Sequence, residues 1–431
     1  MLSRTFIKKF FHFSSVLTDW SPKGGAKLLD SLLFPIVGNP LLSGLWSRRN
    51  KIRLQKIRKF EKILVLSDVH LGDAIVLQGS VAALRELFPK AQIDYAVKRS
   101  MEKILEGNPL FSNVIPLFTE SPLPGKKDLE SAKKLLAEGG YDICFNFCPF
   151  FQDGEFFPQD EKVLHFVTHG PHLVFNQWAK KEPNHFHFQA YEFIHQLLAR
   201  FRSPDRPQSY RGPSIVLSDE AVEEAENFLE ANHLKGPEPL LFLNPDTASP
   251  YTRVPSHYLA ELLWGLSSLP GKVLLGASFS EPGAEQRLLN CLPSSFRTWV
   301  TVVPTSLSLP AYAALTDRAD LFLSGDTGPL HVAAARKISK SGRHSFRNKT
   351  SVFCLFGATL AGFSGYASED TLFCPAAQDA PSRVYVSESP CRNLTCLNKM
   401  YKTCKELRCF EFLDVEKILE DAGRFVETVH S

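Results

Sequence analysis

The sequence predicts an α/β protein made of two similar domains, each with a parallel sheet covered by helices. Buried apolar runs typical of strands alternate with helical apolar patterns along most of the 431 residues. This alternation occurs twice, and a polar, proline-bearing stretch at 202–208 separates the two series. The chain is long enough for each series to bury its own core. Because ligands bind at the carboxyl ends of strands in open parallel sheets, we expect the post-strand loops of both domains to face one cleft.

The first series begins with the apolar run 63–67, which indicates a strand. It continues through the turn 71–73 into a periodic apolar stretch that predicts a helix up to Phe88, where Pro89 ends it. The other elements expected here are strands at 93–97, 114–117 and 141–147 and helices at 129–137 and 189–201. The stretch 145–187 is rich in Phe, His and Pro without a regular period, and we expect it to form loops and short helices that line the cleft.

The second series opens with a helix capped by Ser218 or Asp219, with acidic residues in its first turn. The elements expected after it are strands at 239–244, 272–276, 321–324 and 351–356 and helices at 256–269, 285–291, 309–316 and 329–335. The sequence therefore predicts an N-terminal extension (1–60), two Rossmann-like domains (61–205 and 206–412) and a C-terminal helix (413–431).

The composition excludes several classes of protein. With 44% hydrophobic and 22% charged residues, the chain is neither collagen-like nor wholly disordered. Lys and Arg number 49 against 46 Asp and Glu, and a net charge of only +3 argues against a nucleic-acid binder. Nine cysteines in so long a chain are too few for a disulfide-stapled secreted domain, which favours a reducing compartment.

The N-terminal extension combines aromatic residues with cations. No stretch reaches the roughly 18 apolar residues of a spanning helix, and no signal-peptide pattern follows the first cations. Phenylalanines at 6, 10, 11 and 13 stand beside two lysines, and the run 48–62 holds eight cations and one acid. This pattern suits a segment in a membrane interface over anionic lipid. The alternative is a solvated basic helix whose phenylalanines pack on the first domain.

The most specific string is 321–335, in which a buried strand enters an Asp326-Thr327-Gly328 turn and a helix of small residues. Pro329 fits the first helical position. The start of such a helix presents free backbone N–H groups and a positive dipole end, which together bind phosphate. His331 lies in the first turn and is placed to reach the same anion. The alternative is a capped helix with an incidental histidine.

Two other post-strand loops carry polar side chains. In the first, Gly72 permits a tight turn, and Asp73 is either an N-cap or a base that points into the cleft. In the second, at 243–255, hydroxyls including that of Thr247 stand near Arg253, a combination suited to holding a diphosphate. The alternative for this second loop is an ordinary exposed loop.

Together these strings resemble glycosyltransferase family 9, the ADP-heptose:lipopolysaccharide heptosyltransferases. The resemblance covers roughly 62–412. It rests on the strand leading into Gly72-Asp73, on Ala83-Leu-Arg-Glu-Leu-Phe-Pro89 with Ile93-Asp94, on Gly107-Asn-Pro109, on the loop 243–255, on Gly325-Asp-Thr-Gly-Pro-Leu-His331 and on Leu355-Phe-Gly357.

The resemblance implies a GT-B fold and an inverting transfer of heptose, or a related sugar, from a nucleotide diphosphate sugar to a lipopolysaccharide-type glycolipid. The donor implied is ADP-heptose, with no cofactor and no bound metal. Asp73, in the acceptor domain 61–205, would be the base that deprotonates the acceptor hydroxyl. The residues that would hold the donor in the domain 206–412 are Asp326, Thr327, Gly328, His331, Thr247 and Arg253. We expect a cytoplasmic monomer, peripheral on the inner membrane.

The sequence departs from the family pattern at three places. Ser67 stands where an arginine is usual, Gly79 where a proline is usual, and Thr252 where a lysine is usual, so that Arg253 would replace that lysine. These departures leave open a catalytically silent GT-B protein that binds a nucleotide or glycolipid as an assembly factor. A nucleotide-dependent oxidoreductase would need a Gly-x-Gly-x-x-Gly string after the first strand, and only one glycine is present there.

Two further clusters are set aside. Cys391, Cys396, Cys404 and Cys409 do not have the spacing of a zinc ribbon, so we expect no metal there. The basic stretch 336–349 is expected to be an exposed loop, with binding to an anionic glycolipid as the alternative.

Overall fold

A computed structural model describes residues 59–121, 125–148, 164–167, 186–198, 210, 212–247, 252–278, 281–338, 350–357, 366, 382–388 and 408–430. The aromatic and basic extension lies outside these residues, apart from its last two positions. Phe60, at the second of these positions, is buried in the first core, and its ring meets the edge of Phe88 at 5.0 Å between centroids. Three of the four C-terminal cysteines and most of the basic stretch 336–349 also lie outside the described residues.

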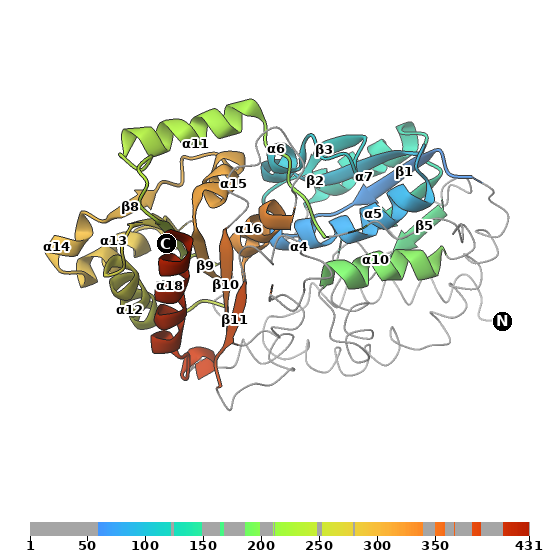
Figure 1. The fold of residues 1–431 in the computed structure, drawn as a ribbon. Helices are drawn as coiled ribbons and strands as arrows, with labels where there is room; N and C mark the ends of the chain where they lie inside the picture. The colour runs from blue at the N-terminus through green and yellow to red at the C-terminus, as the bar shows by residue number, and fades with distance from the viewer. Residues whose placement is uncertain are drawn as a thin grey trace.

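The chain forms two parallel sheets, which confirms the α/β class (Figure 1). The first sheet has the order β3-β2-β1-β4-β5, and the second has the order β11-β10-β9-β6-β7-β8. All the strand pairs are parallel. Every connection between neighbouring strands must therefore cross over the sheet, which places helices on both of its faces.

The first sheet and its helices run from residue 62 to residue 197. Their bounds are β1 (Lys62–Leu66), α4 (Leu71–Val76), α5 (Gln78–Leu87), β2 (Gln92–Lys98), η1 (Arg99–Met101), α6 (Glu102–Leu105), β3 (Asn113–Phe118), α7 (Lys126–Glu138), β4 (Ile143–Asn146), β5 (Leu164–Val167) and α10 (Phe186–Leu197). Residues Leu64 and Leu66 of β1 pack towards α7, whereas Ile63 and Val65 pack towards α4, α5 and α10. A strand buried on both faces needs a continuous apolar run, and KILVL supplies it.

The second sheet and its helices run from residue 219 to residue 430. Their bounds are α11 (Asp219–Ala231), β6 (Leu240–Asn244), α12 (Ser256–Ser267), β7 (Lys272–Gly276), α13 (Ala284–Cys291), α14 (Ser294–Arg297), β8 (Val300–Val303), α15 (Leu309–Arg318), β9 (Leu321–Gly325), α16 (Gly328–Ile338), β10 (Ser351–Phe356), β11 (Arg383–Val386), η6 (Arg408–Phe410) and α18 (Val415–His430). Ser218 caps α11 as predicted, because its side chain accepts a hydrogen bond from the Ala221 N–H at 3.3 Å.

The prediction was wrong or incomplete at several short elements. The helix expected up to Phe88 is two helices, because the Ser80 N–H bonds to the Leu77 carbonyl in a tighter turn between them. Strands β5, β8 and β11 were not predicted. Each has four residues and lies at an edge of its sheet, so none needs a long apolar run.

The C-terminal helix α18 packs on α12 of the second sheet. Ile418, Ala422 and Val426 are buried in the core on that face. Buried Asp421 accepts a hydrogen bond from the Tyr385 hydroxyl at 2.9 Å.

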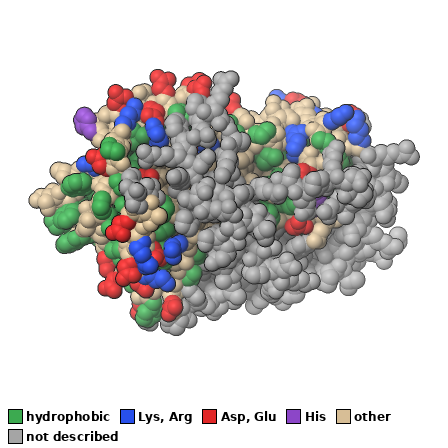
Figure 2. Space-filling model, in the orientation of Figure 1, with side chains coloured by type: hydrophobic (Ala, Val, Ile, Leu, Met, Phe, Trp, Pro, Cys, Tyr) green, Lys and Arg blue, Asp and Glu red, His purple; other side chains and the backbone are tan. Residues whose placement is uncertain are grey.

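Among the described residues, no helix is long and apolar enough to cross a membrane. The left-hand part of Figure 2 shows Lys and Arg side chains close to Asp and Glu side chains, in agreement with the balanced net charge.

The segment 212–217 contacts helices from both halves of the chain. On the first side, the Gln78 side-chain oxygen accepts a hydrogen bond from the Ser214 N–H at 2.8 Å. On the second side, Arg336 of α16 donates to the Ile215 carbonyl and pairs with Asp317 of α15. The expectation that Arg336 belongs to an exposed loop was therefore wrong. It is the ninth residue of a helix, and a buried carboxylate compensates its charge.

Candidate functional site

Helices α4 and α16 meet at their N-terminal ends, where the first and second sheets come together (Figure 1). A Cβ on Gly72 would lie 2.7 Å from Cδ2 of His331, and a Cβ on Gly328 would lie 3.2 Å from Cβ of Leu71. Any side chain at Gly72 would therefore displace the histidine ring. One buried apolar cluster continues across this junction and includes residues of both sheets. The junction joins the ends of β1 and β9, as expected for a site at the carboxyl ends of parallel strands.

The role predicted for Gly72 as a loop-forming residue was wrong. Helix α4 already begins at Leu71, and the residue before it, His70, is the N-cap. Gly72 is a helical residue with ordinary dihedral angles, so it is not needed for a tight turn. What requires glycine at this position is the close approach of His331 from the other half of the chain.

Asp73 occupies the first turn of α4 and faces the junction. It is not an N-cap, because that position belongs to His70, so this alternative was wrong. The role of Asp73 as a base stays a prediction. Burial lowers the pKa of His331 and raises that of Tyr95, and the charge of Asp73 acts upward on both pKa values, which places its carboxylate near both side chains. The Tyr95 hydroxyl donates to the Ala74 carbonyl at 3.1 Å and thereby holds this turn of α4 against β2.

His331 is a buried, neutral side chain at the start of α16. Its Nδ1 lies 2.8 Å from the hydroxyl of Tyr366, and its Nε2 lies 3.9 Å from a carboxylate oxygen of Asp326. Burial lowers the pKa of His331 to about 4, although the charge of Asp73 acts in the opposite direction. Near neutral pH the ring can therefore donate a hydrogen bond without adding a positive charge to the site.

The turn between β9 and α16 holds the other predicted donor residues. Asp326 and Thr327 lie between the end of the strand at Gly325 and the start of the helix at Gly328. Pro329 is the second helical residue, one position later than predicted. The Thr327 hydroxyl is buried and has no hydrogen-bond partner within the described part of the chain. Pro329 has no N–H, and the Leu330 N–H already bonds to the Thr327 carbonyl at 3.1 Å, so fewer N–H groups are available here than predicted. A buried hydroxyl beside the Gly328 N–H, at the positive end of a helix, is still a suitable contact for an anion.

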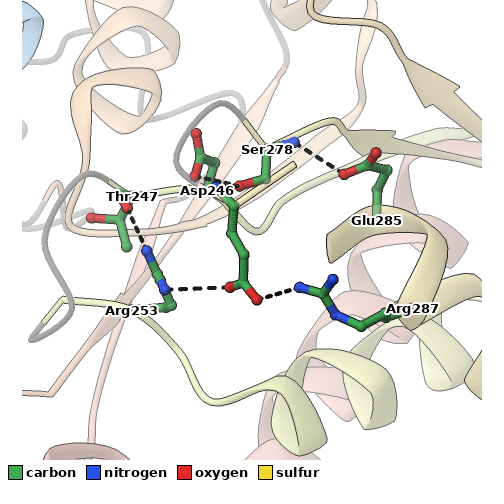
Figure 3. A network of polar contacts seen from close by, with 7 residues as sticks. Asp246, Thr247, Arg253, Ser278, Glu285 and Arg287 are labelled. Atoms are coloured by element: carbon green, nitrogen blue, oxygen red, sulfur yellow. Dashed lines mark hydrogen bonds and ion pairs between the residues drawn. The ribbon is translucent and has the colours of Figure 1, made fainter. Parts of the chain in front are cut away.

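The loop after β6 lies beside this turn, but its cation is already paired (Figure 3). Arg253 approaches Glu281 at 3.3 Å and donates to the Thr247 carbonyl at 3.4 Å. Glu281 also pairs with Arg287 of α13. The Thr247 hydroxyl lies 2.7 Å from the Thr252 hydroxyl. A diphosphate that used Arg253 would therefore have to share it with the Glu281 carboxylate.

The first sheet presents a cation at its carboxyl edge that sequence reasoning missed. Ser67 is fully buried at the end of β1 and supplies no charge. Lys98, the last residue of the neighbouring strand β2, is also buried, and its charge opposes the rise that burial causes in the pKa of Asp68. A lysine that ends an apolar strand is the sequence signal that would have indicated this cation.

Three other residues missed at the sequence level are Tyr366, Glu281 and Asp317. Their partners are His331, Arg253 and Arg336, respectively. Each partner is distant in sequence, so no local pattern indicates the contact. Within the described ranges, no group of three or more His, Cys, Asp or Glu side chains could hold a metal ion. Of the four C-terminal cysteines only Cys409 is described, and it is buried.

Comparison with known proteins supports the predicted resemblance. Residues 173–340 match the model of glycosyltransferase family 9 (heptosyltransferase). A protein of Haemophilus influenzae described as a candidate glycosyltransferase is 23% identical over 288 residues, which cover 65% of this chain and 82% of that protein. The segment 173–340 includes the two loops predicted to hold the donor, whereas Asp73 lies outside it.

Two solved structures share the fold. The glycosyl transferase of family 9 from Veillonella parvula is 18% identical and has a TM-score of 0.63, covering 86% of this chain and 99% of that chain. The ADP-heptose lipopolysaccharide heptosyltransferase II of E. coli is 16% identical and has a TM-score of 0.55, covering 86% and 100%. The GT-B-type fold, the matched segment and these relatives identify the chain as a glycosyltransferase related to glycosyltransferase family 9.

Proposed function

We propose that this protein moves a heptose, or a related sugar, from a nucleotide diphosphate sugar to a lipopolysaccharide-type glycolipid, with inversion at the anomeric carbon. ADP-heptose is the donor proposed. The observation that carries the proposal is the junction of α4 and α16, where the carboxylate of Asp73 acts on His331 across the two halves of the chain. A base from one side and an anion site from the other are the two components that such a displacement needs.

In the proposed reaction, an acceptor hydroxyl attacks the anomeric carbon as its proton passes to the Asp73 carboxylate. The bond between the anomeric carbon and the phosphate oxygen breaks, and the electron pair leaves with the nucleoside diphosphate. The Gly328 N–H and the positive end of α16, together with Thr327 and His331, stabilise the charge that develops on the leaving group. Thr247 and Arg253 hold the diphosphate from the loop after β6. Protein groups supply this stabilisation in the proposal, without a bound metal or other cofactor.

The acceptor is presented by a membrane in this proposal. We therefore place the protein as a monomer at the cytoplasmic face of the inner membrane, with the extension 1–60 at the lipid surface. The support for this placement is the pattern of phenylalanines and cations in the sequence.

A catalytically silent assembly factor is the second candidate. The pairing of Arg253 with Glu281 favours it, because the cation expected to hold the diphosphate already has a carboxylate partner. A buried serine in place of the usual arginine, at position 67, also favours it. Such a protein would bind the nucleotide and transfer no sugar.

The substitution Asp73→Asn separates the two candidates. For an enzyme, we expect kcat to fall ~10²–10⁴-fold, because a general base supplies about that much, while ADP affinity stays within about twofold. Asp219→Asn is the matched control, since Asp219 is an exposed acid in the first turn of α11. Transfer within a few-fold of the wild type in the Asp73 variant would remove this residue from the mechanism. A wild type that binds ADP but transfers no sugar would favour the assembly factor.

A further inference from the structure

Tyr366 contacts the site histidine from a part of the chain that no sequence pattern assigned to the site. Its hydroxyl lies 2.8 Å from Nδ1 of His331, and the two rings meet edge to face with centroids 5.7 Å apart. Both side chains are buried. Because a buried polar group is costly when its hydrogen bond is not made, this contact fixes the orientation of the ring.

The other ring nitrogen faces the junction of the two halves. Nε2 of His331 lies 3.4 Å from the position that a Cβ on Gly72 would take, and 3.9 Å from the Asp326 carboxylate. Asp73 of α4 is the second carboxylate whose charge acts on the ring. A neutral imidazole carries one proton, on either Nδ1 or Nε2, and the partners of the two nitrogens decide which.

The partners favour a proton on Nε2. A carboxylate oxygen of Asp326 lies 3.9 Å from Nε2, so an N–H there is attracted to it, whereas a lone pair there would be repelled. On the other side, the phenol of Tyr366 can donate its O–H to the Nδ1 lone pair. We propose that Tyr366 is a positioning residue that holds His331 in the neutral Nε2–H form, with this N–H directed at the junction of α4 and α16.

This tautomer has a consequence for catalysis, which rests on the proposed function. A neutral Nε2–H donates a hydrogen bond to an oxygen of the donor substrate at the start of α16. A cationic ring would instead stabilise the ionised form of Asp73 and weaken it as a base. The Tyr366 hydroxyl therefore gives the site a directed donor, and the neutrality that burial imposes on His331 leaves Asp73 able to accept the proton of the acceptor hydroxyl.

The first test is an NMR measurement on the free protein with ¹⁵N-labelled histidine. The wild type should show a protonated Nε2 and an unprotonated, hydrogen-bonded Nδ1 for His331 between pH 6 and pH 8, with the signals assigned by their loss in His331→Gln. In Tyr366→Phe, the Nδ1 signal should move towards that of a nitrogen without a hydrogen bond. An Nδ1–H tautomer in the wild type, or an Nδ1 signal unchanged in Tyr366→Phe, would overturn the proposal.

The second test is a double-mutant cycle on ADP binding. Tyr366→Phe should weaken ADP binding about fivefold, the effect of one ordinary hydrogen bond. In the His331→Gln background it should have no further effect, because the glutamine amide offers an N–H that needs no tautomer to be selected. Tyr385→Phe is the matched control, since its buried hydroxyl donates to Asp421 of α18 and not to the site.

Equal losses from Tyr366→Phe in both backgrounds would show that Tyr366 acts independently of His331, and the proposal would then be wrong. The NMR test needs no substrate, so it remains decisive even if the wild type transfers no sugar. That failure would count against the proposed function alone.

Discussion

At the scale of single residues, burial decides the protonation state of His331 more than the neighbouring charges do. Two carboxylates, Asp73 and Asp326, lie near a ring that nevertheless stays neutral, because burial penalises the cation by more than Asp73 favours it. The usual expectation that a histidine beside acids is positively charged therefore does not hold here. The free energy of unfolding should therefore depend on pH.

The first prediction concerns this pH dependence. The folded-state pKa of His331, about 4, lies below its ordinary value of 6.5, so the unfolded chain binds more protons between these values. The contribution of His331 to the free energy of unfolding is therefore fully present above about pH 6.5 and is lost as the pH falls towards 4. The total loss is up to about 3 kcal/mol. Urea unfolding of the wild type and of His331→Gln over this range measures it. The variant should show a shallower decline, and equal slopes would contradict the prediction.

A second prediction at this scale concerns the buried hydroxyl of Thr327. Thr327→Val and His331→Ala should each weaken ADP binding, by about three- to tenfold, because each removes one polar contact to the anion. Thr301→Val on the half-buried edge strand β8 is the matched control. Calorimetry with ADP measures all three, and unchanged affinity in both site variants would place the phosphates elsewhere.

At the scale of elements, the site depends on how closely α4 approaches α16. The missing Cβ of Gly72 is what allows the histidine ring to lie over the first turn of α4. Helix formation alone would favour alanine at a helical position, so the glycine costs local stability in exchange for the tertiary contact.

Gly72→Ala tests this contact. The new methyl would lie 2.7 Å from Cδ2 of His331, so the ring or the helix must shift, and we expect a loss of about 1–3 kcal/mol in the free energy of unfolding. Adding His331→Ala should recover part of that loss by making room. Gly423→Ala in α18 is the matched control, because its methyl would meet Leu269 at an ordinary 3.5 Å. The control should be neutral or stabilising by about 0.5–1 kcal/mol. Equal effects of the two alanines would contradict the argument.

At the scale of the whole molecule, the two sheets are joined through shared contacts as well as through the chain. The buried cluster at the α4–α16 junction is continuous, and the segment 212–217 bonds to Gln78 on one side and to Arg336 on the other. Asp73 and the start of α16, which are the base and the anion site of the proposed function, are thus held together by contacts that would have to change if the two halves moved apart.

The prediction at this scale concerns the extension 1–60. A variant that begins at Lys59 keeps Phe60, which is part of the first core, and removes the other phenylalanines of the extension. It should lose salt-sensitive sedimentation with anionic vesicles, because each near-surface cation contributes ~1 kcal/mol, and should still transfer sugar to a delipidated acceptor. Sedimentation like that of the full chain would contradict the membrane role. Insolubility would instead indicate that those phenylalanines complete the core.

The sequence by itself determined the α/β class, most strands and helices, and the string at 321–335 that led to the family. These features are local, because a buried strand or a capped helix is written in consecutive residues. Only the tertiary structure decided why Gly72 is a glycine, why Arg336 is buried and which group holds His331. The physical reason is that each depends on a partner distant in sequence, namely His331, Asp317 and Tyr366, and no local pattern records which segments pack together.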